Sequence, residues 1–497
     1  YRATGTIGGL TLVSRIAGFA RDMLLARILG PGMAADSFFV AFQLPNIFRR
    51  LFAEGAFAAA FVPLCSRKLG KDDDMAAAER FSSEVVSVFV PVLILFVALF
   101  EVAMPAIIWL MASGFQEVPG KFELTVALAR LTFPYLFLIS MVALLAAILN
   151  SLSRFAAGAS FPILLNLMLI TALLVGDQMA PSLATAVGSP EGETIVVAYF
   201  LAGGVALGGV AQLLWLWFWM RRSGFRLRFH RPRFTKDVRE LGIIILPATF
   251  GAGVYQISQL VQLFFATQLP SGSVSHLNFA DRLNQLPLGV IGIALGTAIL
   301  PALSRHIGAD DKEQADRVQS NAIELAMLLT LPAAAALMIC APAFVSAFFQ
   351  GGAFDAEDAR ITSNVLAALV AGLPAYVLIK VLTPAFFSRK DTKTPVYAAA
   401  VVLFFFITFN TLMIDRLGIV GIAIATAIGA WFNVIILYTI LQKRGHYQLN
   451  LGLVRRLLGQ MLATAAMAVL LYYLLPFLSD WFGGSVIERV LSIAALV

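Results

Sequence analysis

Runs of about 20 apolar residues recur along the whole chain, and this pattern constrains the fold more than any other feature of the sequence. A helix of about 20 residues crosses a hydrocarbon core of about 30 Å. Hydrophobic residues make up 60% of the 497 residues and charged residues only 13%, whereas a soluble domain is about 25% charged. These values exclude a water-soluble fold, and we expect an all-α polytopic membrane protein.

The apolar runs, separated by polar breaks, predict about fourteen transmembrane helices, with the last one incomplete at the end of the sequence. The predicted spans lie near residues 4–29, 34–66, 82–111, 122–150, 155–176, 194–220, 238–268, 274–304, 318–349, 359–387, 395–414, 418–441 and 453–476, and from 486 onward.

The basic residues predict the orientation of these spans. Of the 36 lysines and arginines, 23 lie in loops that follow even-numbered spans and only four lie in loops that follow odd-numbered spans. Cytoplasmic loops are enriched in Lys and Arg. We therefore expect the even loops and both termini on the cytoplasmic side of a bacterial inner membrane. The same topology accounts for the net charge of +7, so nucleic acid is not an expected partner.

Short motifs repeat in order along the chain. Gln-Leu-Pro ends at Pro45 and again at Pro287, and Pro63 opens a Pro-x-x-Ser-Arg-like segment that recurs at Pro301. The repeat predicts two pseudo-symmetric six-helix lobes, residues 1–222 and 223–444, followed by two C-terminal helices in residues 445–497. Repeats of this kind are typical of secondary transporters, whose substrate site lies between the halves.

Charged residues interrupt the first two spans. The first contains Ser14, Arg15, Arg21 and Asp22, and the second contains Asp36, Arg49, Arg50 and Glu54. A charge at the centre of a lipid-facing helix costs about 2.5–3.5 kcal/mol. Six of these charges, all except Asp36, lie deep in the spans, and their combined cost of about 15–20 kcal/mol would exceed the net stability of a typical fold, about 5–15 kcal/mol. We expect these side chains to face a hydrated cavity or one another.

Helical spacing favours two internal pairs, Arg50 with Glu54 and Arg15 with Asp22, which would only lock helices together. The arginines nevertheless outnumber the acids, and Arg282 beside Asp281 adds a cation from the second half. The planar guanidinium group suits phosphate oxygens. We therefore expect a phosphate-binding cavity. Lys380 could neutralise a substrate, although snorkelling or a salt bridge explains it equally well.

Motifs for chemical catalysis are absent from the sequence. It has no Gly-rich phosphate loop ending in Gly-Lys-Ser/Thr, no His-Glu-x-x-His and no paired-cysteine metal spacing. We expect no catalytic residue, no metal site and no cofactor. A coupling ion, sodium or proton, stays open.

Three segments resemble the MurJ (MviN) lipid II flippases of the multidrug/oligosaccharidyl-lipid/polysaccharide exporter superfamily. The first reads SRIAGFARDMLLARILGPGMAADSFFVAFQLPNIFRRLFAEGAFAAAFVP from Ser14 to Pro63. The others are Ala280-Asp281-Arg282 with Gly296 to Pro301, and FSRKDTKTP from Phe387 to Pro395. The resemblance covers essentially the whole chain.

This resemblance implies two lobes around a central cationic cavity and two C-terminal helices that form a groove for a polyprenyl tail. The implied activity is transfer of undecaprenyl-diphosphate-linked peptidoglycan precursor, lipid II, to the periplasmic leaflet by alternating access. It implies diphosphate binding by Arg15, Arg21, Arg49 and Arg282. The positions implied to support gating or packing are Ser14, Asp22, Asp36, Arg50, Glu54, Asp281 and Lys380.

Two other functions remain compatible with the sequence. A cation-coupled multidrug or polysaccharide-lipid exporter on the same scaffold would require acids and aromatic residues in the cavity. A membrane scaffold for cell-wall enzymes would not transport anything. The expected partners are the lipid-linked precursor, membrane lipids and cell-wall synthesis proteins, and we expect a monomer.

Overall fold

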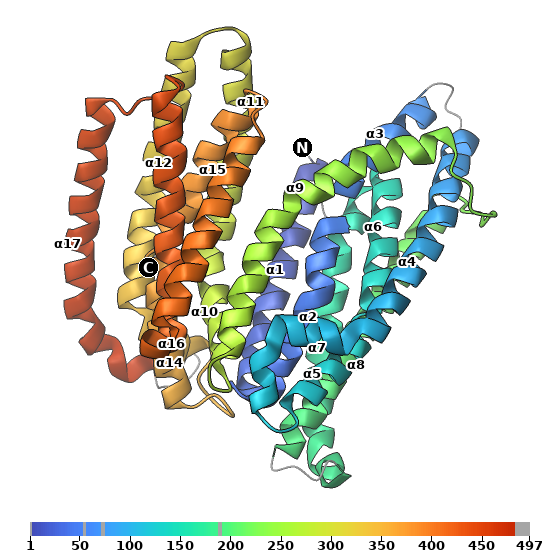
Figure 1. Ribbon diagram of the computed structural model, residues 1–497, viewed down its shortest axis with the longest axis horizontal. Helices are drawn as coiled ribbons and strands as arrows, with labels where there is room; N and C mark the ends of the chain where they lie inside the picture. The colour runs from blue at the N-terminus through green and yellow to red at the C-terminus, as the bar shows by residue number, and fades with distance from the viewer. Residues whose placement is uncertain (1, 53–55, 71–74, 187–190, 483–497) are drawn as a thin grey trace. The chain divides into compact units, whose positions relative to one another are not determined.

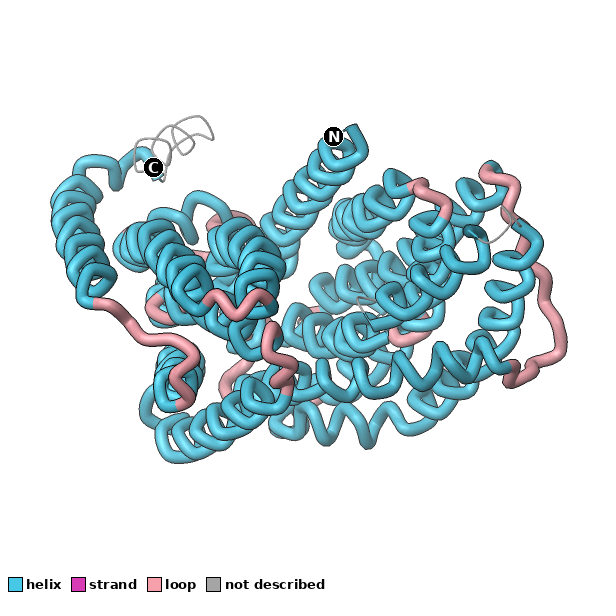
Figure 2. Tube along the Cα trace, turned by 90° about the horizontal axis from the view of Figure 1, so that it is seen from above, coloured by secondary structure: helices cyan, strands magenta, loops and turns pink. Residues whose placement is uncertain are grey.

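The computed structural model of the chain describes residues 2–52, 56–70, 75–186 and 191–482, which form helices joined by short loops (Figures 1 and 2). Apart from one β-bridge between Gly351 and Phe354, these residues contain no β-structure. The prediction of an all-α fold is confirmed.

The chain divides into two compact units, residues 1–272 and 273–497. The predicted boundary at 222/223 lies one long helix earlier. That helix, α9, packs on α2, α3 and α4 of the first unit. Compact units and repeated lobes are different divisions of a chain, so the lobe boundaries stay a prediction.

The first unit is built from nine α-helices and two short helical turns among the described residues. They are α1 (Arg2–Leu29), α2 (Met33–Phe52), α3 (Ala56–Gly70), α4 (Met75–Ala112), η1 (Ser113–Glu117), α5 (Lys121–Thr132), α6 (Tyr135–Ser151), α7 (Phe155–Leu183), η2 (Ala184–Ala186), α8 (Gly192–Arg222) and α9 (Lys236–Thr267).

The second unit continues in the same way. Its described elements are α10 (Ser273–Pro287), the π-helical turn η3 (Leu288–Gly292), α11 (Ile293–Gly308), α12 (Lys312–Ile339), α13 (Ala341–Phe348), α14 (Ala356–Val370), α15 (Leu373–Phe387), α16 (Lys393–Lys443) and α17 (Leu451–Phe482).

Nine segments of the described chain are long and apolar enough to cross a membrane. They cover ten of the predicted spans, because 395–414 and 418–441 both lie in α16, on either side of a break at Gly418 where φ is 54°. The chain is thus a multi-pass membrane protein. The predicted span 34–66 is divided between α2 and α3. Because the fourteenth span lies outside the described residues, the count of fourteen stays a prediction.

Small residues allow α7 and α8 to form the most extensive helix pair of the first unit. A Cβ atom added at Gly204 would lie 2.7 Å from the Cβ of Ala172, and one added at Gly208 would lie 2.7 Å from Leu165 Cδ1. Helices in a membrane associate through close backbone approach at such small-residue positions, since lipid tails already solvate apolar side chains.

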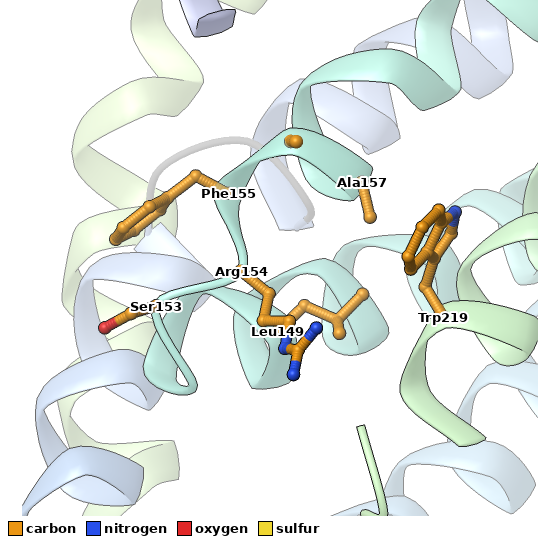
Figure 3. Close-up of a pocket in the computed structure, with 7 residues that line it drawn as sticks. Leu149, Ser153, Arg154, Phe155, Ala157 and Trp219 are labelled. Carbon is orange, nitrogen blue, oxygen red and sulfur yellow. The ribbon is translucent and has the colours of Figure 1, made fainter. Parts of the chain in front are cut away.

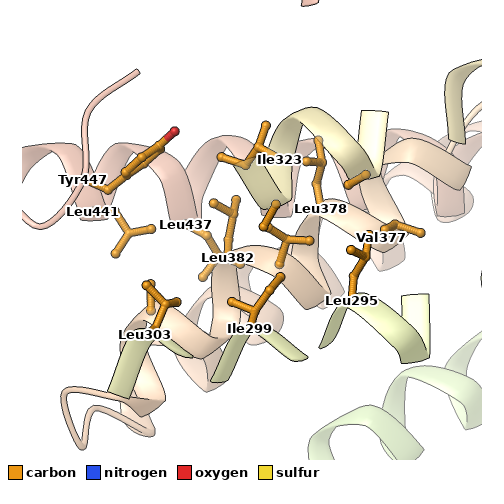
Figure 4. Packing of buried hydrophobic residues seen from close by; sticks show 14 of the residues in the cluster. Leu295, Ile299, Leu303, Ile323, Val377, Leu378, Leu382, Leu437, Leu441 and Tyr447 are labelled. Carbon is orange, nitrogen blue, oxygen red and sulfur yellow. The ribbon is translucent and has the colours of Figure 1, made fainter. Parts of the chain in front are cut away.

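The second unit has a continuous apolar core (Figure 4). Leu295, Ile299 and Leu303 form a stripe at four-residue spacing on α11, and the stripe belongs to one cluster with buried residues of α12, α15 and α16. Tyr447 closes one end of the core, where its hydroxyl lies 3.0 Å from Ser320 Oγ. By contrast, α17 contacts only α12 and α13 extensively, and it exposes most of its apolar surface.

The sequence repeat is visible in the local geometry of both units. Pro63 in α3 and Pro301 in α11 each lie seven residues before the glycine that ends the helix. The ends of α6 and α15 also match: Ser153 has φ 59° and Lys390 has φ 60°. In each case the next amide donates to the carbonyl five residues earlier, closing a Schellman turn.

Asp391, directly after the second of these turns, organises a polar clasp. Its carboxylate accepts from the amides of Lys393 and Thr394, from the Thr394 hydroxyl at 2.6 Å and from Arg444 Nη1 at 2.6 Å. The clasp caps the start of α16 and ties it to the end of the same helix, beyond the Gly418 break. These hydrogen bonds, with that from Thr394 Oγ1 the largest influence, lower the pKa of Asp391 to about 2.

Candidate substrate-binding site

The first cluster of predicted site residues joins α1 to α7. Arg21 donates through Nε and Nη2 to Asp22 Oδ1 at 3.0 and 2.6 Å, and through Nη1 to Asn166 Oδ1 at 3.0 Å. Asn166 in turn donates to the backbone carbonyl of Ser14 at 3.1 Å. Gly18 makes room for this amide, because an added Cβ would touch it at 3.5 Å.

These contacts hold the Arg21 guanidinium in one orientation. Its side chain is only 11% exposed, and that of Asp22 is 6% exposed. A guanidinium has five N–H donors. The three bonds above leave two donors without a hydrogen bond to a described residue. Arg21 is therefore anchored to both α1 and α7. The expected pairing of Asp22 with Arg15 is replaced by pairing with its direct neighbour.

Arg15 lies two turns before Asp22 on α1. The residue is exposed, and it forms no ion pair with any residue that the structure describes. An unpaired guanidinium is stable in a membrane protein only where water or an anion can reach it. The structure therefore leaves the guanidinium of Arg15 accessible.

On α2, Arg49 donates through Nε to Asn46 Oδ1 at 3.3 Å, and Asn46 donates to the carbonyl of Phe42 at 2.9 Å. The amide thereby connects the guanidinium to its own helix one turn earlier. Arg49 is half-buried and Arg50 is exposed. Glu54, the predicted partner of Arg50, lies outside the described residues.

Asp36 at the start of α2 has a different environment. Its Oδ2 accepts from Lys121 Nζ at 2.8 Å and from the amide of Gly272 at 2.7 Å. Lys121 also donates to Ser271 Oγ and lies 4.0 Å from the centre of the Phe115 ring. Both charged side chains are 1% exposed. Asp36 therefore connects α2, α5 and the segment after α9, and it is not available to neutralise an arginine deeper in the span.

In the second unit, Asp281 on α10 accepts from Gln285 Nε2 and, at 3.4 Å, from Asn284 Nδ2. Its neighbour Arg282 is exposed. Lys380 on α15 lies against η3, where a Cβ added at Gly292 would approach Lys380 Nζ to 3.2 Å. The glycine thus makes room for the lysine side chain.

Within the first unit, the structure groups the predicted residues into three local networks: Arg21–Asp22–Asn166–Ser14, Arg49–Asn46 and Asp36–Lys121. Sequence reasoning missed Asn46, Asn166 and Lys121. Asn166 had a detectable signal, an amide in the middle of an apolar span. Lys121 had none, because it follows Val-Pro-Gly and reads as a loop residue.

Two cavities lie at helix ends and are lined by none of the predicted residues. One, of about 260 Å³, is bordered by Leu149, Arg154 and Trp219 (Figure 3). The other, of about 450 Å³, is bordered by Tyr397, Val401 and Arg444 among others. Among the described residues, no three His, Cys, Asp or Glu side chains are grouped so that they could hold a metal ion.

Comparisons with known proteins agree with the fold. Residues 25–492 match the family model described as lipid II flippase MurJ. A probable lipid II flippase MurJ of Rhizobium meliloti is 40% identical over 95% of this chain and 86% of its own length. The lipid II flippase MurJ of Burkholderia cenocepacia is 32% identical over 100% and 94%.

Two solved structures extend these similarities. A lipid II flippase MurJ in an inward closed conformation superposes with a TM-score of 0.76 at 26% identity, covering 99% of this chain and 97% of that one. An inward-facing multidrug resistance MATE transporter superposes with a TM-score of 0.63 at 17% identity, covering 88% and 97%. At that identity, the second similarity shows the fold alone.

Proposed function

The chain belongs to the MurJ family of lipid II flippases, and from that premise we propose that it carries lipid II, an undecaprenyl-diphosphate-linked peptidoglycan precursor, across the bacterial inner membrane. As a member of this family it is a transporter rather than an enzyme. We propose that it works as a monomer by alternating access, with Arg15, Arg21, Arg49 and Arg282 binding the diphosphate.

One observation carries the assignment of the site. Both acids in the described parts of α1 and α2 already have cationic partners: Asp22 is paired with Arg21, and Asp36 with Lys121. Because Lys121 comes from α5, the surplus of arginine over acid on α1 and α2 is larger than the sequence of those helices suggests. A surplus of guanidinium groups in membrane-spanning helices favours an anionic ligand with several oxygens.

We propose that the arginines have different roles in binding the diphosphate. Arg21 is oriented by Asp22 and Asn166 and still has donors to offer, so it suits the role of a fixed contact to one phosphate. Its pairing with Asp22 cancels its formal charge. Arg15 on the same helix is exposed and pairs with no acid among the described residues, so it supplies net positive charge for a diphosphate.

The test is a comparison of Arg49→Ala, Arg49→Lys and Arg130→Ala in cells depleted of their own flippase. Losing a hydrogen bond to a charged group costs about 1.5–3 kcal/mol, or about 10- to 100-fold in binding. We expect Arg49→Ala to lower the amount of lipid II accessible at the outer surface by at least tenfold, and Arg49→Lys to lower it less. Arg130, an exposed residue of α5, serves as the matched control.

Alanine variants of Arg15, Arg49 and Arg282 separate the alternatives. A multidrug exporter would keep supporting growth after Arg49→Ala and lose drug resistance. A scaffold for cell-wall enzymes would tolerate Arg15→Ala and Arg282→Ala as long as the protein is made at normal levels. If Arg15→Ala, Arg49→Ala and Arg282→Ala all show a normal amount of lipid II at the outer surface at wild-type protein levels, the proposed site is contradicted. We propose no cofactor; coupling to sodium or protons would appear as a dependence of flipping on that gradient.

A further inference from the structure

The connection between α8 and α9, residues 225–235, is an extended strap that lies along the first turns of α4 (Figure 1). The amide of Arg226 donates to Glu79 Oε1 at 2.7 Å, that of Arg228 to Ser83 Oγ at 3.0 Å and that of His230 to Ser87 Oγ at 2.9 Å. At its end, Thr235 Oγ1 donates to Glu84 Oε2 at 2.9 Å.

The spacing of these bonds explains why the strap fits the helix. Four residues of an α-helix rise about 6 Å, and two residues of an extended chain rise about 6.6 Å. Alternate amides of the strap therefore meet every fourth side chain of α4. Phe225, fully buried, anchors the beginning. Most of the strap is thus held by its backbone, and its exposed side chains remain available for other contacts.

Those side chains are basic and aromatic. Four arginines, at positions 226, 228, 231 and 233, are exposed, and no acid occurs between Arg222 and Lys236. Phe229 is 67% exposed and Phe234 80% exposed. Exposed apolar side chains among polar ones on one surface are typical of protein or membrane interaction sites.

The acids beside the strap in the described part of the chain already have partners. Glu79 and Glu84 accept from the strap backbone and from Thr235, Asp237 is bound by Lys68 at 2.7 Å, and Glu240 lies 3.7 Å from Arg67. None of the four strap arginines forms an ion pair with a residue of the described ranges. Their charge is therefore available to an external anion.

The strap also lies close to the apolar, membrane-spanning part of α4. Ser87 directly precedes the long apolar run of α4, whereas Glu79 lies two turns earlier, about 12 Å farther out along the helix. The chain therefore approaches the apolar zone between Arg226 and His230. Beside it, α8 ends in Trp215, Trp217, Phe218 and Trp219 followed by two arginines, a composition typical of a membrane interface.

We propose that the strap is a docking surface for anionic phospholipid headgroups of the leaflet at this end of the helices, which the basic loops predict to be the cytoplasmic one. The arginines would bind the headgroup phosphates, and Phe229 and Phe234 would insert among the upper parts of the acyl chains. Clusters of four to eight basic residues beside a membrane span attract anionic lipids in this way. This surface is separate from the proposed lipid II site.

The test uses the purified full chain in detergent, with short-chain phosphatidylglycerol and phosphatidylcholine compared by native mass spectrometry. We expect wild type to prefer phosphatidylglycerol. The triple variant Arg228→Gln, Arg231→Gln, Arg233→Gln should lose at least tenfold of that preference, since one basic side chain near an anionic surface is worth about fivefold. The matched control replaces Lys390, Lys393 and Arg455, which are also exposed, by Gln and should change it less than twofold.

Two further variants test the strap itself. Ser83→Ala with Ser87→Ala leaves every charge in place but removes two backbone anchors, and it should lower the preference for phosphatidylglycerol. Phe229→Ser with Phe234→Ser alters only exposed positions and should weaken the binding of both lipids without changing their ratio. Equal lipid preferences of the strap triple variant and the control triple variant would overturn the proposal. So would an unchanged preference in a folded Ser83→Ala, Ser87→Ala protein. Capture of an acidic peptide with no lipid preference would also overturn it.

Discussion

Asp36, a predicted site residue, forms with Lys121 the most deeply buried ion pair of the described residues. Replacing one partner of such a pair leaves an uncompensated charge, which costs about 3–5 kcal/mol. We therefore expect Asp36→Asn or Lys121→Met to lower the unfolding temperature in detergent strongly. The double variant Asp36→Leu, Lys121→Met should regain a large part of the loss. Equal unfolding temperatures for wild type and Asp36→Asn would contradict this role.

Asn166 provides a second prediction at this scale. Asn166→Leu removes the acceptor of Arg21 Nη1 and the donor to the Ser14 carbonyl. We expect a loss of about 1–3 kcal/mol in stability and a fall in lipid II flipping that exceeds the loss of folded protein, because Arg21 is no longer oriented. Leu167→Ala, at the exposed neighbouring position, controls for changes in α7. If lipid II flipping falls only in proportion to the amount of folded protein, Asn166 does not orient Arg21 for transport.

At the scale of elements, α7 and α8 depend on glycine at their contact. In Gly204→Ala the new methyl group would collide with Ala172 at 2.7 Å, whereas at Gly203 nothing lies within 4 Å. Overpacking costs about 1–3 kcal/mol, and Gly→Ala in an open helical position gains up to about 1 kcal/mol. The two adjacent variants should therefore shift the unfolding temperature in opposite directions. Identical shifts in unfolding temperature for the two variants would show that helix propensity, and not the α7–α8 contact, determines the effect of the substitution.

The clasp at the start of α16 predicts a pH dependence. Asp391 has a pKa of about 2 in the folded chain against an ordinary value of 3.8. A carboxylate with a lowered folded pKa stabilises the fold above its unfolded pKa, and this contribution disappears as the pH falls from about 4 to about 2. Asp391→Asn should be less stable than wild type at pH 5, and the unfolding temperatures of the two proteins should converge near pH 2. Parallel curves across this range would show that the clasp does not contribute.

At the scale of the whole molecule, moving a net anion from an inside-negative compartment to the outside is favoured by about 2.3 kcal/mol per charge at 100 mV. If the arginines stay with the protein while the diphosphate crosses, the membrane potential alone can drive the proposed flipping. We expect proteoliposomes to flip lipid II faster with an imposed potential of that sign and more slowly with the opposite sign. Equal rates in both cases would show that another energy source is required.

Sequence alone determined the class of fold and the residues most costly to bury. Apolar runs of membrane length allow little except helices, because backbone groups in lipid must be satisfied within the segment. The same reasoning identified Arg15, Arg21 and Arg49, since a charge in a span needs an explanation wherever it lies. The repeat around Pro45 and Pro287 required only ordered matches in the chain.

Only the tertiary structure decided which charges neutralise each other. Helical spacing predicted Arg15 with Asp22, but the structure places Arg21 on Asp22, and it brings Lys121 to Asp36 across 85 residues of sequence. Ion pairing between helices depends on which helices pack side by side, and this cannot be read from the amino-acid sequence of each helix. The strap could not be predicted either. Its amides meet the side chains of α4 only because the two segments lie side by side, and because two extended residues and four helical residues span nearly the same length.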